Sequence, residues 1–164
     1  MRALIHESTP NHLIATWESV VIPVWRVETT MSGVLMLDKV FDAAAQQYPS
    51  GVFLLTIVEP NAPVPTPDVR KAMALMLTKW ASRLLVSAVV HEGTGFRAAM
   101  VRSVVIGVAM LTKLPFRHKV FSTIDEAARW FAATSATAAA WGGEKPLVDA
   151  VAEVRARVVR SATA

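Results

Sequence analysis

The sequence contains no cysteine, and this absence removes several classes of protein at once. Disulfide frameworks, thiolate zinc sites, iron–sulfur clusters and cysteine nucleophiles all require that side chain. Charged residues are also scarce, at 18% of the chain, whereas 53% of the residues are hydrophobic. Disordered chains have the opposite balance, so the composition predicts a compact domain with a hydrophobic core. The 164 residues suit one domain, or one domain with an appendage.

No hydrophobic run is long enough to cross a membrane. The longest spans residues 104–111, whereas a membrane helix needs about 20 residues. Residues 1–11 include Arg2, Glu7 and Pro10 and do not resemble a signal peptide. We therefore expect a cytoplasmic protein without a transmembrane segment.

Basic residues exceed acidic ones only slightly, with 17 Lys and Arg against 13 Asp and Glu. Proteins that bind nucleic acids gather their cations in one run or on one face. Here the cations are scattered along the chain, and no aromatic residues alternate with them to stack on bases. The sequence therefore predicts no nucleic-acid partner.

The order of the expected elements favours an α/β fold. Strand patterns occupy residues 12–17, 19–26, 51–58, 84–90 and 117–121, and a helical pattern follows the second strand and each later one. This alternation predicts a mostly parallel five-stranded sheet with helices on both faces, in the order ββαβαβαβα, and a further C-terminal helix. Pro23 lies inside the second pattern. Because proline lacks a ladder N–H, it predicts a sheet edge, a bulge or a misplaced boundary there.

The composition changes after residue 133. We expect an α/β domain over residues 1–133, a linker rich in Ala, Thr and Gly over 134–145, and an amphipathic helix over 146–164. The helix expected from about residue 96 to 114 is hydrophobic nearly all round, and the last helix has an apolar stripe at helical spacing. Either the last helix folds back on the domain, or a second subunit covers both surfaces.

This surplus of apolar helix surface predicts a homo-oligomer or docking to a protein partner. The residues expected at the interface are Val104, Val108, Leu111, Leu147, Val151, Val154 and Val158.

Two segments resemble a known family. Residues 121–131 read as a strand end, an acidic helix cap and an aromatic–apolar pair, and residues 93–97 read as a glycine-containing turn into a helix. Both resemble STAS domains, which occur in sulfate transporters and anti-sigma-factor antagonists, and especially the bacterial SpoIIAA-like proteins. The resemblance covers residues 13–131 and implies a regulatory module that binds a partner protein.

In that family the start of the second helix can be phosphorylated. Thr66 is the only hydroxyl residue at the matching place in this chain. It stands before Pro67, whereas the family has an Asp-Ser-Ser-Gly type of motif there. The resemblance therefore implies Thr66 as a possible phosphorylation site, while the plain alternative is a helix cap.

The turn at residues 91–97 is the best candidate for a small-ligand site. It joins the end of a buried strand to a helix, at the kind of sheet edge where ligands of α/β proteins bind. Glycine N–H groups, a helix N-terminus and a guanidinium can together hold an anion or a lipid headgroup. The residues expected at this edge are Thr30, Glu59, His91, Thr94 and Arg97. The alternative is a tight turn that Thr94 caps.

No catalytic constellation is recognisable. The four histidines have no spacing that suits a metal ion, and no serine lies in a nucleophile elbow. We therefore expect a non-enzymatic regulatory or scaffold module that acts by protein–protein interaction, without a cofactor or a metal. The alternative is a domain that binds a small ligand, a lipid or an anion at the sheet edge.

Overall fold

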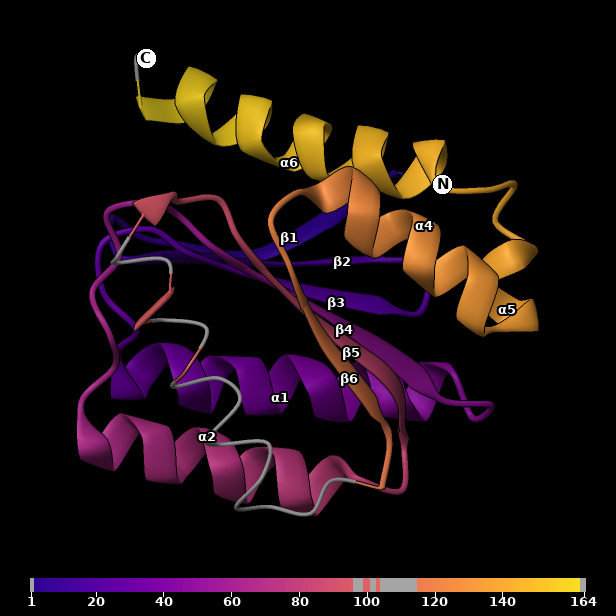
Figure 1. Cartoon of the computed structure of the whole chain (residues 1–164), viewed down its shortest axis with the longest axis horizontal. Helices are drawn as coiled ribbons and strands as arrows, with labels where there is room; N and C mark the ends of the chain where they lie inside the picture. Colours follow the sequence, from indigo (N-terminus) through magenta and orange to yellow (C-terminus); the bar gives the residue numbers. More distant parts are fainter. Residues whose placement is uncertain (1, 96–98, 101–102, 104–114, 163–164) are drawn as a thin grey trace.

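One β-sheet lies between two layers of helices (Figure 1). The computed structural model describes residues 2–95, 99–100, 103 and 115–162, with side chains as far as residue 157. Helices α1 and α2 cover one face of the sheet, and α4, α5 and α6 cover the other. The α/β class and the placement of helices on both faces are therefore confirmed.

The sheet contains six strands within the described residues, in the sequential order β1 to β6. The three strands β1, β2 and β3 form antiparallel pairs, and β3, β4, β5 and β6 pair in parallel. The strands are β1 (Leu4–Ser8), β2 (His12–Trp17), β3 (Val20–Trp25), β4 (Val52–Val58), β5 (Leu84–His91) and β6 (Arg117–Phe121).

Strand β1 corrects the expected count of five strands. It lies at an edge of the sheet, and both of its end residues are exposed to solvent. An edge strand needs few apolar side chains, so it lacks the alternating pattern that reveals a half-buried strand. Backbone pairing with β2 is what places it, and the register shifts between Ile5 and Glu7.

Pro23 lies in β3, which is an interior strand, so it marks neither a sheet edge nor a misplaced boundary. The carbonyl groups of Ser19 and Trp25 accept hydrogen bonds from residues on the β4 side. Successive residues of a strand direct their backbone N–H and C=O groups to opposite sides. Pro23 is an even number of residues from Ser19 and Trp25, so its nitrogen also faces β4. Pairing of β3 with β4 is interrupted between Val21 and Val24 without a change of register. The missing N–H of Pro23 therefore leaves one position between β3 and β4 without a hydrogen bond.

The described helices are α1 (Met31–Gln47), α2 (Pro67–Trp80), α4 (Ile124–Thr134), α5 (Ala136–Ala139) and α6 (Lys145–Ala162). None of them is long and apolar enough to cross a membrane. Most of the helix expected over residues 96–114 lies outside the described residues.

Local capping explains where three helices begin. Thr30 caps α1 by accepting a hydrogen bond from the Gly33 N–H at 3.1 Å. Thr123 and Glu126 form a reciprocal capping box at the start of α4. Thr66 occupies the cap position of α2 without a side-chain cap bond, and Pro67 supplies the fixed φ that suits a first turn.

The C-terminal helix packs against the same sheet. Leu147, Val151 and Val154 of α6 are 1%, 1% and 0% exposed and belong to the hydrophobic core on one face of the sheet. The expected linker over 134–145 contains α5 and Trp141, whose ring lies 4.9 Å from that of Phe53. Between the two possibilities that the sequence left open, α6 folds back on its own chain.

Candidate functional site

The carboxyl ends of the parallel strands meet at one edge of the sheet. Strand β4 is followed there by Glu59, and β5 ends in His91 and continues to Glu92. The Arg155 guanidinium reaches this edge from α6 and donates two hydrogen bonds to the Glu92 carboxylate, at 2.9 and 2.8 Å. Its Nη2 atom also lies 3.8 Å from Glu59. A single arginine therefore bridges two carboxylates from neighbouring strands.

The structure brings only part of the expected ligand site to this bridge. Glu59 lies there, and His91 is fully buried one residue before Glu92, where its Nδ1 accepts a hydrogen bond from the Gly93 N–H at 3.2 Å. Thr94 is exposed. The Thr30 hydroxyl is engaged as the cap of α1. Arg97 lies outside the described residues.

The charges of this edge do not favour an anion. Glu59 and Glu92 carry two negative charges, and the Arg155 guanidinium beside them already binds both carboxylates. An incoming anion would have to compete with these carboxylates for the cation and would meet their repulsion. The described part of the edge therefore gives no support to the alternative of an anion or lipid-headgroup site.

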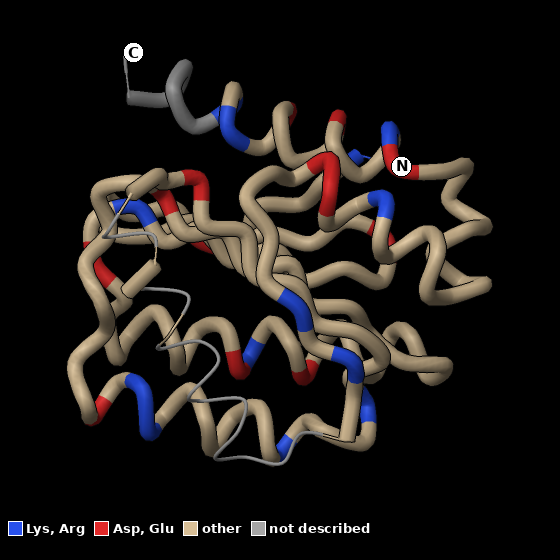
Figure 2. Tube along the Cα trace, in the orientation of Figure 1, with Lys and Arg blue, Asp and Glu red and all other residues tan. Residues whose placement is uncertain are grey.

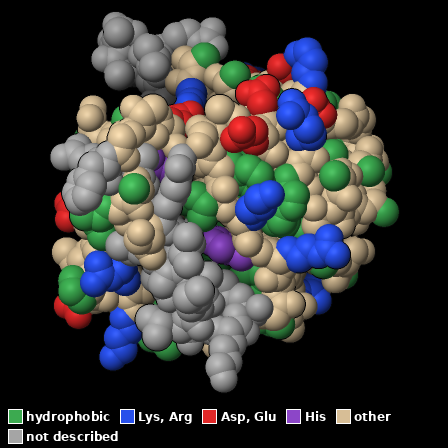
Figure 3. All heavy atoms as spheres, viewed as in Figure 1, with side chains coloured by type: hydrophobic (Ala, Val, Ile, Leu, Met, Phe, Trp, Pro, Cys, Tyr) green, Lys and Arg blue, Asp and Glu red, His purple; other side chains and the backbone are tan. Residues whose placement is uncertain are grey.

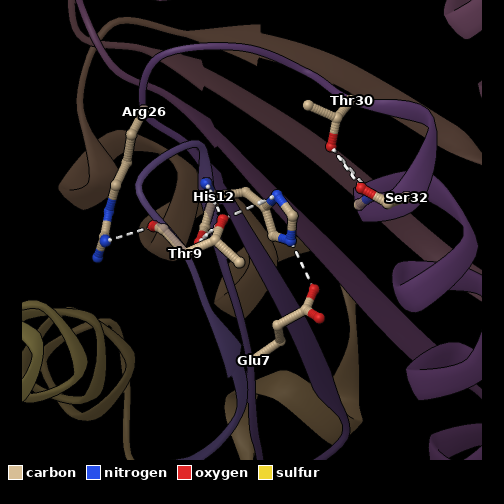
Figure 4. Close-up of polar contacts among 7 residues, drawn as sticks. Glu7, Thr9, His12, Arg26, Thr30 and Ser32 are labelled. Atoms are coloured by element: carbon tan, nitrogen blue, oxygen red, sulfur yellow. Dashed lines mark hydrogen bonds and ion pairs between the residues drawn. The ribbon is translucent and has the colours of Figure 1, made fainter.

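A second polar cluster surrounds His12, whose side chain is 3% exposed (Figure 4). The His12 Nε2 atom lies 2.6 Å from the Glu7 carboxylate, and Nδ1 lies 3.4 Å from the Thr9 hydroxyl. The imidazole also packs edge-on against the ring of Trp25, with 5.6 Å between the ring centroids. The antiparallel register pairs His12 with Trp25, so the cluster lies at the end of β3.

The start of α1 closes over this cluster. A Cβ atom at Gly33 would lie 2.7 Å from the Trp25 ring and 2.9 Å from the His12 Nδ1 atom, so only glycine permits the approach. The hydroxyls of Thr30 and Ser32 lie 3.1 Å apart beside it (Figure 4).

The chain of carboxylate, imidazole and hydroxyl has the order of an acid–base relay, and its members also hold the local backbone in place. The Thr9 hydroxyl accepts a hydrogen bond from the backbone N–H of His12 at 3.1 Å, which holds the turn between β1 and β2. The Arg26 guanidinium donates to the Thr9 carbonyl at 3.2 Å and fastens the same turn. The cluster therefore locks the β1–β2 hairpin against β3 and α1.

Ser87 and His118 form a third polar pair between β5 and β6. The two residues are register partners, and the Ser87 hydroxyl lies 3.1 Å from the His118 Nδ1 atom. Within the described structure, His118 Nε2 is buried without a hydrogen-bond partner. Burial lowers the pKa of His118, because the charged imidazolium is poorly solvated there.

Sequence reasoning missed the His12–Glu7, Ser87–His118 and Arg155–Glu92 pairs. Pairing of β1 with β2 brings Glu7 to His12, and the register of β5 and β6 brings Ser87 to His118. The packing of α6 on the sheet brings Arg155 to Glu92. One signal was available, because His12 begins an apolar strand pattern and a buried histidine needs a polar partner.

The expected interaction residues divide into two groups. Leu147, Val151 and Val154 are buried in the chain's own core, which leaves none of them exposed for a partner. Val104, Val108 and Leu111, and the side chain of Val158, lie outside the described part of the chain.

The described residues contain no group of three or more His, Asp or Glu side chains that would suit a metal ion. Thr66 is exposed at the start of α2, and Arg70 of the same helix donates to the neighbouring Pro65 carbonyl at 3.1 Å. Phosphorylation of Thr66 stays a prediction.

Comparisons of the chain with protein-family models, curated proteins and solved structures find no match.

Proposed function

We propose that this chain is a cytoplasmic, non-enzymatic regulatory or scaffold module of the STAS type, which acts through protein–protein contacts and self-associates. One observation carries the proposal. Three large apolar side chains project from the outer side of the α1–α2 layer: Met31 is 41% exposed, Leu35 58% and Leu75 63%. We call these three residues the outer apolar patch.

The two leucines of the patch come from corresponding levels of two neighbouring helices. The Asp38 carboxylate accepts hydrogen bonds from the Lys79 ammonium, at 2.8 and 3.0 Å, and from the Trp80 indole. Leu35 lies about one turn before Asp38 on α1, and Leu75 about one turn before Lys79 on α2. Both helices return from parallel strands and therefore run in the same direction.

The opposite sides of the same helices are already used in the core. Leu37 and Phe41 of α1 and Met76 of α2 are buried against the sheet. The outer apolar patch therefore belongs to neither core cluster of the described residues, whereas a partner helix could bury it. Fully burying one leucine side chain stabilises an interface by about 1.5–3 kcal/mol.

The charges around the patch support a second copy of the chain as the partner. Lys39 and Asp42 are both exposed on α1, and Asp38 and Lys79 form an ion pair between the helices. Burial alone would raise the pKa of Asp38, but the bonds from Lys79 and Trp80 and the Lys79 charge outweigh it and lower that pKa, so the carboxylate stays charged. A surface with both signs around an apolar centre can be complementary to itself across a two-fold axis.

Sedimentation velocity over a range of concentrations tests this proposal. We expect the mass of the wild-type protein to rise with concentration, and Leu35→Asp and Leu75→Asp to remain monomeric. Leu4→Asp is the matched control, because Leu4 has the same 58% exposure as Leu35 but lies on β1. Circular dichroism should show all three variants folded.

A wild-type protein that stays monomeric up to about 100 µM would refute self-association. So would a loss of association in Leu4→Asp as large as in the patch variants. Substitutions in α6 such as Val154→Asp are unsuitable, because they place a charge in the core and unfold the protein.

A further inference from the structure

Strand β6 forms the second edge of the sheet and differs from β1. Within the described residues its single strand partner is β5, in a parallel register that runs without interruption from Arg117 to Phe121. The β1 edge contains a register shift, which hinders pairing with another strand. The outer backbone of β6 is therefore a regular row of donors and acceptors.

Side chains of β6 and α4 form a small apolar surface beside these backbone groups. Alternation along the strand places Arg117, Lys119 and Phe121 on the face that α4 covers, and His118 on the other face. The ring of Phe121 lies 5.4 Å from that of Trp130 on α4, and both are only partly buried. The Lys119 ammonium lies 5.3 Å from the Phe121 ring centroid. Figure 3 shows a hydrophobic area in the middle of this view with Lys and Arg side chains over and beside it.

The β6 edge is positively charged, which favours an acidic partner. Arg117 and Lys119 are exposed, and β6 contains no acidic residue (Figure 2). Acidic residues begin in the first turn of α4, where the capping box holds Glu126. A second copy of β6 paired here would bring like charges together, which is destabilising. An acidic strand would instead neutralise both cations.

We propose that the outer edge of β6, which pairs with no other strand of the described residues, binds an extended acidic peptide segment of a partner protein. This segment adds to the sheet as a further strand. The peptide backbone pairs with β6, an apolar or aromatic side chain packs on Phe121 and Trp130, and acidic side chains meet Arg117 and Lys119. This mode obtains affinity from the backbone and specificity from alternate side chains. It uses a surface separate from the outer apolar patch and holds whether or not the chain self-associates.

Fluorescence anisotropy with the full chain tests the proposal, using a labelled peptide in which Glu alternates with Val and Phe. We expect saturable binding that Lys119→Glu weakens about tenfold or more, because it reverses the charge beside Phe121. Lys145→Glu is the control, since Lys145 is an 80% exposed lysine on α6 and should leave binding unchanged. A peptide of the same sequence with N-methyl groups on alternate backbone nitrogens should not bind, because it cannot pair with the strand.

Three outcomes would overturn the proposal. The first is an absence of binding at about 1 mM peptide. The second is equal binding of the N-methylated peptide, which would show charge attraction without strand pairing. The third is tighter binding of a single-stranded oligonucleotide than of the peptide, which would assign the edge to nucleic acid. Because the N-methylated probe leaves the protein unchanged, a folding defect in Lys119→Glu cannot explain its result.

Discussion

Arg155 of α6 binds Glu92 at the end of β5 through two parallel hydrogen bonds of 2.9 and 2.8 Å. The two residues are 63 positions apart in the chain, so the contact joins the C-terminal helix to the sheet. Both side chains are about three-quarters buried, at 29% and 26% exposure. A partly buried, bidentate ion pair of this kind is more rigid and less screened by salt than a surface ion pair.

Arg155→Ala should therefore lower the free energy of unfolding by about 1–3 kcal/mol, between the values typical of surface and of buried pairs. The control is Arg2→Ala, which removes a pair between Glu153 and a 74% exposed Arg2 and should cost less than about 1 kcal/mol. Urea denaturation measures both values. Equal losses in the two variants would mean that the Arg155 pair contributes no more than a surface contact.

Gly33→Ala should destabilise the protein, although alanine is the better helix former by about 1 kcal/mol. The added methyl group would press on Trp25 and His12 at 2.7 and 2.9 Å, and both of these rings are buried, so they have little room to move away. We expect a loss of about 1–3 kcal/mol in urea denaturation. Ser32→Ala, one position earlier and exposed, should change stability by less than about 0.5 kcal/mol. A Gly33→Ala protein as stable as the wild type would contradict this close packing.

Leu147→Ala should cost about 2–5 kcal/mol, because it leaves a cavity between α6 and the sheet. Leu4→Ala removes the same atoms from an exposed position and should cost less than about 0.5 kcal/mol. Thermal denaturation followed by circular dichroism distinguishes the two. If Leu147→Ala melted at the wild-type temperature, α6 would not be part of the core in solution.

The stability of the protein should fall as the pH is lowered through about 6.5, because burial lowers the pKa of His118 in the folded state. The unfolded chain then takes up a proton that folded His118 does not, so acid favours unfolding in this window. Burial lowers the pKa of His6 as well, and its contribution has the same sign. Urea denaturation at several pH values between about 8 and 5.5 gives the free energy of unfolding as a function of pH. This free energy should change less with pH in His118→Gln than in the wild type. An equal change in both proteins would show that His118 is protonated equally in the folded and unfolded states.

The sequence predicted features that depend on neighbouring residues. The apolar run at residues 51–58 and the helix cap within residues 121–131 each lie within one short segment, and both predictions are confirmed, as β4 and as the capping box of α4. Strand β1 was missed because an edge strand is held by backbone pairing, which leaves little trace in side-chain pattern. The polar pair Ser87–His118 was missed for a related reason, since strand register decides it.

By itself, the amino-acid sequence determined the α/β class, the succession of buried strands and amphipathic helices, and the apolar stripe of the last helix. These follow from periodicity and capping, which act over a few residues. Only the tertiary structure decided that α6 covers its own sheet, that Arg155 meets Glu92, and which apolar side chains stay exposed. An apolar stripe requires burial but does not specify its partner, and the choice depends on contacts between residues far apart in the chain.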